Sequence, residues 1–451
     1  MPVGLARAGV SPGGRTRGLT VWLTASPLRA ACVLTAIALA ARLLFLVPLI
    51  ERFPKPWQNE FQAAEMGNLA VNLYEGRGFS SPFSHGAQPS AWLAPFTPAL
   101  WAGLMKLTHG ASPRTARIIV LLQAVPSALA VGVCWLAAAI LAQRQQWRRG
   151  WLLIVGLALA LWPESFVRLP DIWYYPWQEL GIAVLVYLGL RWEDAPSVRN
   201  GLWLGVAAGA TALVNPVPIL IFFVALGLPF FRKRDQYFSL TYATAVALMV
   251  AAVLVAPWLV RNYRVFGHFV PIRSDFGVEL LQGNNDSGAV KQQITSLHPA
   301  LDALEFQEYQ TLGEIEYERR CFRRAVAYMI AHPGVTATRT LERFYVAWCT
   351  DLTSAWPWTP GAQWWRVNAF ERLTNVSTIL CALLPLMLFV YGLWWVRTDV
   401  RGAELVLAVL LLVPLPYYLT QVDDAYMQPV RVWLFILAAS LVARRIRIAA
   451  E

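Results

Sequence analysis

Long apolar runs recur along this 451-residue chain, and they constrain its fold more than any other feature. Hydrophobic residues make up 57% of the chain and charged residues only 14%, whereas about a quarter is charged in soluble domains. Apolar runs of this length are typical of segments that cross a bilayer. We therefore expect an all-α polytopic membrane protein with about ten to twelve transmembrane helices and two outer-face loops that carry short helices.

Several of these runs are short for a hydrocarbon core of roughly 30 Å, so they must tilt or extend at their ends. The first run is too long for a cleaved signal sequence, and we interpret it as an uncleaved first helix. The predicted spans cover residues 30–50, 115–142, 150–163, 176–191, 201–214, 216–231, 238–260, 375–396, 403–419 and 429–443.

The charge of the connecting segments predicts the orientation. Cytoplasmic loops of membrane proteins carry an excess of Lys and Arg, so the basic connections are expected in the cytoplasm and residues 51–90 outside. Those basic connections contain Arg144, Arg148, Arg149, Arg191, Arg199, Arg232, Lys233, Arg234, Arg397, Arg401, Arg444, Arg445 and Arg447. The chain then divides into a cytoplasmic segment 1–29, a transmembrane catalytic module 30–260, a periplasmic helical loop 261–374 and C-terminal transmembrane helices 375–451.

The net charge of +11 is therefore explained by topology and by anionic lipid headgroups. No nucleic-acid-binding motif accompanies the basic residues, so no nucleic-acid partner is expected.

One stretch does not fit a simple alternation of cytoplasmic and outer connections. Residues 91–108 are apolar but contain Pro95 and Pro98, and a span here would move the loop with Arg144 outside. We favour a re-entrant or interfacial helix. The alternative is that residues 115–142, which contain Pro126, form two shorter helices.

The first outer loop contains the strongest candidate for acid–base chemistry. If residues 59–75 form a helix, Glu65, Asn68, Asn72 and Glu75 lie on one face and apolar side chains on the other. A carboxylate held near the lipid interface loses water, which suits it to act as a general base. The alternative is an exposed Glu on an interfacial helix. Glu60 lies about 140° from Glu65 around such a helix, so the two share a site only if the helix breaks.

A second group of polar residues follows the span 238–260. Arg261, Asn262 and Arg264 emerge at the outer interface, where arginine binds phosphate or anchors the helix. Arg273 and Asn284 follow in a turn-rich loop and complete a possible phosphate and hydroxyl pocket. Asn215 precedes a proline between two apolar helices, where it lines a cavity or caps a helix.

The second outer loop is balanced in charge. Residues 305–332 have helical periodicity. We expect a solvated helix face, on which arginines pair with the glutamates Glu314, Glu316 and Glu318; the arginines are Arg319, Arg320, Arg323 and Arg324. Cys321 and Cys349 lie in the same loop, where an oxidising compartment would allow them to pair or leave them free.

No GxSxG, P-loop, HExxH or GxGxxG motif is present in a suitable context. A familiar hydrolase, nucleotide enzyme or zinc protease is therefore not expected, and an activated donor would have to be lipid-borne. The few His and Cys residues are not spaced as metal ligands, so no cofactor is assigned and a divalent metal is left open.

Several segments, taken in order, resemble the GT-C superfamily of polytopic glycosyltransferases, which includes protein O-mannosyltransferases and lipid A aminoarabinose transferases. The similarity is to a bacterial clade of such proteins. It rests on EMGNLAVNLYEGRGFSSPF, AWLAPFTPALWAGLMKL, ALVNP, PWLVRNYRVFGHFVPIRSDFGVELLQGN, and LGEIEYERR followed by AHPG.

The resemblance implies a GT-C-like arrangement of helices and an inverting transfer at the periplasmic face of the bacterial inner membrane. A sugar would move from a polyprenyl-phosphate donor to a lipid, glycan or protein acceptor, with Glu65 as the base. The family more often has Asp, frequently in an Asp-Glu pair offset by about a turn, which keeps Glu60 as a rival. Its Arg-Tyr-Arg-x-Pro pattern near the last helix reads DDAYMQPVR here, so Tyr426 and Pro429 persist and both Arg positions are lost.

Two other classes of function remain open. A transporter or flippase of lipid-linked sugars or polysaccharides would need charged residues along a central path, and the spans carry few. A structural partner in an envelope assembly needs no catalytic carboxylate at all.

Overall fold

The computed structural model describes residues 26–52, 65–84, 86–291, 297–350, 369–395 and 402–448. Within them the chain is helical and contains no β-sheet, so the all-α prediction is confirmed. Six helices of the described chain are long and apolar enough to cross a membrane, which indicates a multi-pass membrane protein. They are α2 (Pro27–Arg52), α6 (Pro113–Gln145), α7 (Arg149–Ala160) with α8 (Pro163–Val167), α12 (Tyr237–Phe266), α18 (Ala369–Trp395) and α21 (Asp424–Ile448).

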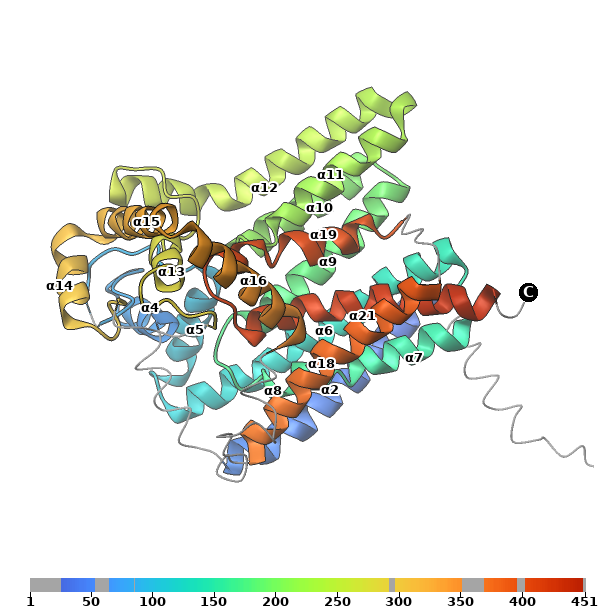
Figure 1. Ribbon diagram of the computed structural model, residues 1–451, viewed down its shortest axis with the longest axis horizontal. Coiled ribbons are helices and arrows are strands. Elements are labelled where there is room, and N and C mark those ends of the chain that lie inside the picture. The colour runs from blue at the N-terminus through green and yellow to red at the C-terminus, as the bar shows by residue number, and fades with distance from the viewer. Residues whose placement is uncertain are drawn as a thin grey trace, which may run out of the picture.

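Shorter helices fill the space between these long ones (Figure 1). Each predicted span coincides with one helix or with two consecutive helices, although several are too short to cross a membrane without tilt or extension. The shorter members are α9 (Tyr175–Asp194), α10 (Val198–Val214), α11 (Ile219–Arg232), the 3₁₀ turn η1 (Arg234–Gln236), α19 (Glu404–Leu412) and α20 (Leu415–Leu419).

The stretch 91–108 forms a separate short helix, α5 (Phe96–Thr108). Its 13 residues reach only about 20 Å, and it is not among the helices that could span. It packs on α4 (Glu65–Tyr74), in keeping with the interfacial interpretation. The following helix α6 continues through Pro126, so the alternative of two short helices is wrong.

Small residues allow a close contact between α10 and α12. A Cβ atom added to Gly201 or Gly205 of α10 would lie 2.6 or 2.4 Å from the carbonyl oxygen of Ala243 or Ala247 in α12. Without side chains on α10, the two backbones come together, as small-residue stripes permit in membrane helices. Residue size, more than hydrophobicity, therefore fixes the position of α12 against the bundle.

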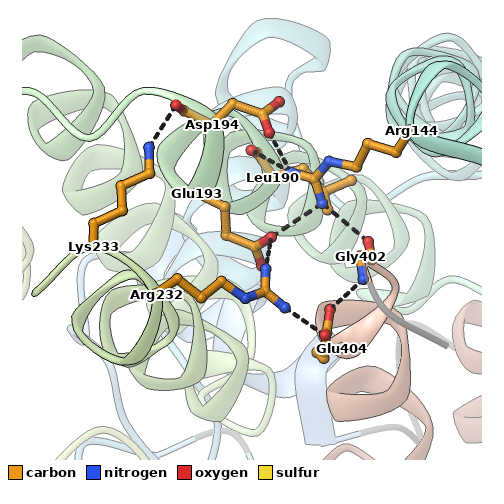
Figure 2. Close-up of polar contacts among 8 residues, drawn as sticks. All are labelled: Arg144, Leu190, Glu193, Asp194, Arg232, Lys233, Gly402 and Glu404. Atoms are coloured by element: carbon orange, nitrogen blue, oxygen red, sulfur yellow. Dashed lines mark hydrogen bonds and ion pairs between the residues drawn. The ribbon is translucent and has the colours of Figure 1, made fainter. Parts of the chain in front are cut away.

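Charged side chains join four helix ends at one end of the bundle (Figure 2). Arg144 of α6 contacts Glu193 at 3.0 Å and Asp194 at 2.7 Å, both at the end of α9. Arg232 of α11 binds the same Glu193 at 3.1 Å and also Glu404 of α19. The basic connections that the sequence groups together thus meet in space, but here Arg144 and Arg232 are neutralised by acidic partners.

The opposite end, called here the loop-bearing end, carries α4, α5, α13 (Phe276–Gly283), α14 (Ala303–Leu312), α15 (Glu314–Ala331) and α16 (Pro333–Cys349) (Figure 1). Buried Glu314 ties these pieces together: it accepts hydrogen bonds from Ala91 N at 2.6 Å, Ser274 Oγ at 2.7 Å and the Tyr309 hydroxyl at 2.9 Å. Glu318, one turn later, accepts from Val278 N at 3.1 Å and so fixes the start of α13.

The arginine face of α15 is solvated, as expected, but its partners differ from the prediction. Arg319 and Arg323 contact Glu316, while Glu314 and Glu318 are buried and bind the polar groups described above. Arg320 and Arg324 reach back to glutamates of α14 instead. Cys321 and Cys349 are free thiols, so they do not form a disulfide.

Candidate functional site

Glu65 is the first residue of α4, at the loop-bearing end. A carboxylate in the first turn is stabilised by the partial positive charge of the helix N-terminus. Its Oε1 atom lies 3.1 Å from Nε2 of His298, which stands in the turn before α14. The imidazole is buried, with 4% of its surface exposed, so the contact is shielded from water.

The hydrogen bonds of His298 define its tautomer. Its Nδ1 atom accepts from the backbone N–H of Ala300 at 3.0 Å, so in the neutral ring the proton resides on Nε2 and is donated to Glu65. The rings of Phe83 and Trp92 meet the imidazole edge-on at 5.4 and 6.0 Å. The imidazole is therefore held in one orientation, and so is the carboxylate oxygen that it contacts.

A cavity of about 220 Å³, called here the Arg273 pocket, lies where the α10–α11 break, the segment before α13 and the α20–α21 turn meet. Proline breaks the helix after Asn215, and the backbone freed there opens the space. The pocket is lined by Tyr174, Asn215, Pro216, Val217, Pro271, Ile272, Arg273, Asp275, Phe276, Glu279, Pro416, Tyr417, Thr420 and Tyr426.

The ionisable groups of this pocket are mostly acidic. Arg273 forms an ion pair with Asp275, which leaves Glu279 as a further carboxyl. The pKa of Glu279 is raised to about 7, first because burial removes the carboxyl from water and then because Asp275 and Glu65 add negative charge; His298 and Arg273 act in the opposite direction. Glu65 is therefore electrostatically part of the same site, although it does not line the pocket.

Aromatic side chains form another wall of the pocket. The rings of Tyr417 and Tyr426 are stacked, with centroids 4.6 Å apart, and Tyr174 lies across the pocket with Arg273 5.9 Å from its ring centre. Aromatic faces beside carboxylates form a surface on which a sugar ring can stack while its hydroxyls donate hydrogen bonds.

Three residues that the sequence singled out line this pocket, namely Asn215, Arg273 and Tyr426. Asn215 donates to Gln178 Oε1 at 3.0 Å, and its own oxygen accepts from Val217 N at 3.2 Å. It therefore lines the cavity and also caps the next turn, so the two interpretations were not exclusive.

Other predicted residues have bonding roles within the loop-bearing end. Asn68 donates to the carbonyl of Pro82 at 2.8 Å, and Asn72 donates to the carbonyls of residues 80, 81 and 84. Both amides lie buried on α4 and hold the turn after the helix, and neither lines the Arg273 pocket. Glu60 lies outside the described residues.

Most of the residues predicted to bind phosphate do not line the Arg273 pocket either. Arg261 donates to the carbonyls of Ser90 at 2.6 Å and Phe79 at 2.7 Å, which joins α12 to the first loop. Arg264 is exposed on α12. Asn262 donates to Val270 O, and Asn284 donates to Leu280 O and Leu419 O. Of this group only Arg273 lines the pocket.

Sequence reasoning missed His298, Asp275, Glu279 and Tyr417. His298 follows Leu297 in an irregular stretch with no periodicity to mark it. The segment SDFGVE, which holds Asp275 and Glu279, offered a usable signal: a Ser-Asp start before a short amphipathic helix. Among the described residues no three His, Cys, Asp or Glu side chains are placed to hold a metal ion, so we assign no metal ligand.

An apolar groove of about 370 Å³ lies on the other side of α20, between α16, α18, α19 and α21. Tyr417 lines the Arg273 pocket and its neighbour Tyr418 lines the groove, so one short helix separates the two. The Trp348 indole donates to the Tyr418 hydroxyl at 2.8 Å and fixes that wall. The remaining lining is formed by Phe344, Cys349, Leu386, Phe389, Leu407, Leu410, Leu411 and Leu434.

Charged residues also lie within the helical bundle. Arg431 of α21 is fully buried, 2.6 Å from Glu164 of α8 and 2.7 Å from Asp424. It does not line the Arg273 pocket. A second buried contact runs from Arg42 through Ser127 toward Glu179.

The sequence matches no known protein-family model, and no curated protein gives a significant match.

Proposed function

We propose that this chain is a membrane glycosyltransferase that moves a sugar from a polyprenyl-phosphate donor to an acceptor, with Glu65 as the general base. The observation that carries the proposal is the position of Glu65: it is oriented by His298 beside a pocket lined by carboxylates and tyrosines, at the end of an apolar helical bundle. We place this end outside the cytoplasm, in a bacterial inner membrane, because the basic connections gather at the other end.

In the proposed reaction the two oxygens of the Glu65 carboxylate have different roles. His298 holds Oε1, and Oε2 is the atom that we assign to the acceptor proton. As Glu65 removes the proton from the acceptor hydroxyl or amine, that atom forms a bond to the anomeric carbon of the sugar. The bond between this carbon and the phosphate oxygen breaks, and polyprenyl phosphate leaves with the electron pair. Attack opposite the leaving group inverts the anomeric configuration.

The Arg273 pocket suits the sugar of such a donor. Asp275 and Glu279 accept hydrogen bonds from hydroxyls, and the stacked Tyr417 and Tyr426 present an aromatic surface. Arg273 supplies the positive charge next to the leaving phosphate.

The apolar groove supports a lipid-borne donor. A polyprenyl chain needs an apolar surface, and this groove is lined by α18, α19 and Tyr418, on the other side of α20 from Tyr417 and the Arg273 pocket. A donor can thus place its chain in the groove and its sugar in the Arg273 pocket.

The experiment is a donor screen with the purified protein. It is incubated with a panel of polyprenyl-phosphate sugars and membrane extract, and released polyprenyl phosphate is measured. We expect release with at least one donor, together with a new glycosylated product. Binding of the donors without release of polyprenyl phosphate from any of them would contradict the proposal.

One observation favours the transporter alternative. The sequence suggested few charged residues in the spans, yet Arg42, Glu164, Glu179 and Arg431 are all buried in the bundle. Such residues often line ion or substrate paths. Flux of a labelled lipid-linked sugar across vesicles, without bond formation, would identify a transporter; flux that is absent while transfer occurs would exclude it.

A further inference from the structure

A second, open groove of about 470 Å³ lies between residues 269–277 and α15; we call it the α15 groove. Pro271 and Arg273 line both this groove and the Arg273 pocket, so the two cavities share a wall. Tyrosines line the Arg273 pocket together with Arg273, Asp275 and Glu279. Phenylalanines line this groove together with Arg273, Arg319, Arg323, Glu316 and Glu318. The site therefore has two compartments of different chemistry.

The position of the groove is that of lipid headgroups. Helix α12 ends at Phe266, and the groove begins with Phe269 just beyond it, where α13, α14 and α15 gather (Figure 1). Phe269 is 70% exposed and Phe322, which also lines the groove, is 43% exposed. Exposed aromatic rings next to the end of a membrane-spanning helix are typical of the interface between hydrocarbon and water.

The open side of the groove carries excess positive charge. Arg319 and Arg323 both contact one carboxylate, Glu316, at 3.5 and 2.6 Å. Glu318 also lines the groove but is buried, and this burial holds its pKa well above the usual value. Arg273 is paired with Asp275. A single carboxylate cannot satisfy two guanidinium groups with five N–H donors each, so most donors remain for a ligand. An exposed contact of this kind is weak and easily exchanged.

We propose that the α15 groove binds the phosphate-bearing headgroup of an anionic membrane lipid. Arg319 and Arg323 present guanidinium forks that match phosphate oxygens, and Phe269 and Phe322 contact the glycerol and upper chain region. The lipid chains then continue along the exposed apolar face of α12. That this lipid is the acceptor of the transferred sugar rests on the proposed function; its binding does not.

The test measures binding without donor or turnover. The full-length protein is placed in nanodiscs that contain photoreactive phosphatidylglycerol or, in parallel, photoreactive phosphatidylcholine. After illumination, labelled peptides are located by mass spectrometry. We expect phosphatidylglycerol to label residues 269–277 and 315–323 in preference to phosphatidylcholine.

The double variant Arg319→Ala/Arg323→Ala should lose this labelling by at least about tenfold, the effect of one charge-assisted hydrogen bond. Arg320→Ala is the matched control, because Arg320 lies on the same helix but pairs with Glu308 and does not line the groove. Its labelling should equal that of the wild type.

Three results would overturn the inference. They are equal labelling by both lipids, unchanged labelling in the double variant, and loss of labelling when excess inorganic phosphate is added, which would mean that a soluble phosphate occupies the groove. Since labelling is measured without donor, its failure is separate from failure of the proposed transfer, which the donor screen measures.

Discussion

The Nε2 atom of His298 lies 3.1 Å from Oε1 of Glu65, and the backbone N–H of Ala300 keeps the imidazole proton on the side of the carboxylate. The two residues come from different loops, so the folding of the loop-bearing end brings them together. The contact orients one carboxylate oxygen, and the proposed function assigns the other oxygen to the acceptor.

Removing this contact should lower the rate of the chemical step. His298→Ala frees the Glu65 side chain, and a misplacement of about 1 Å can cost about 100-fold in kcat, while KM for the donor changes little. His298→Gln, whose amide can still donate to Glu65, should recover much of the rate. If the alanine variant keeps at least half of the wild-type kcat, His298 has no positioning role.

The pKa of Glu279 near 7 predicts a pH dependence of transfer. When ionised, Glu279 accepts hydrogen bonds from the sugar and adds negative charge near Glu65, so kcat/KM should rise about tenfold between about pH 6 and 8. In Glu279→Gln this rise should disappear. A pH profile that is identical in the variant and the wild type would assign the ionisation to another group.

The same group predicts a change in stability with pH. Its pKa is raised in the folded protein from about 4.5 to about 7, so the unfolded state binds fewer protons between these values. The contribution of Glu279 to stability should therefore be fully present below about pH 4.5 and fall as pH rises to 7, by about 3 kcal/mol at about 1.4 kcal/mol per pKa unit. Glu279→Gln should be more stable than the wild type above pH 7, as measured by thermal unfolding in detergent, and the difference should vanish near pH 4.5.

The buried ion pair of Arg431 and Glu164 predicts a large effect of single substitutions. Arg431→Met leaves Glu164 and Asp424 without their cation and should cost about 3–5 kcal/mol. The double variant Arg431→Met/Glu164→Gln should be more stable than Arg431→Met alone, because only Asp424 then remains as a carboxylate without its cation. Equal melting temperatures for the two variants would show that the charge pairing is not the cause.

The proposed orientation predicts which positions an impermeant maleimide reaches in intact cells. A cysteine at Leu301, which is 66% exposed at the loop-bearing end, should be labelled from outside. A cysteine at the exposed Asp235 in η1 should be labelled only after permeabilisation. The parent chain with its five natural cysteines is the control. The reverse labelling pattern would place Glu65 on the cytoplasmic side and contradict the proposed function.

Much of the fold was predictable because lipid imposes a simple rule: apolar runs become helices. Each predicted span coincides with helix, and the short α5 was recognised from Pro95 and Pro98. The same logic could not show that Arg144 and Arg232 bind Glu193, because that contact depends on how α6, α9 and α11 pack. Periodicity assigns a residue to a face and leaves its partner undetermined.

The candidate site was predictable only in part, for a similar reason. Glu65 stood out as a carboxylate at an interface, but His298 is a partner from a distant, irregular loop. Arg261 appeared as a phosphate ligand from its type and depth, whereas its guanidinium is used by carbonyls of the first loop. An arginine serves both purposes equally well, and only the three-dimensional structure shows which carbonyls lie within reach.

The central claim is that the Glu65 carboxylate takes the acceptor proton, and a matched pair of variants, one at the first residue of α4 and one just after its end, tests it most directly. Glu65→Gln keeps the size of the side chain and removes the base; Glu75→Gln, at the exposed end of the same segment, leaves the pocket unchanged. Transfer of labelled sugar from the donor found in the screen should be abolished in Glu65→Gln and remain near the wild-type rate in Glu75→Gln, with both proteins folded and inserted. Full transfer by Glu65→Gln would contradict the assignment.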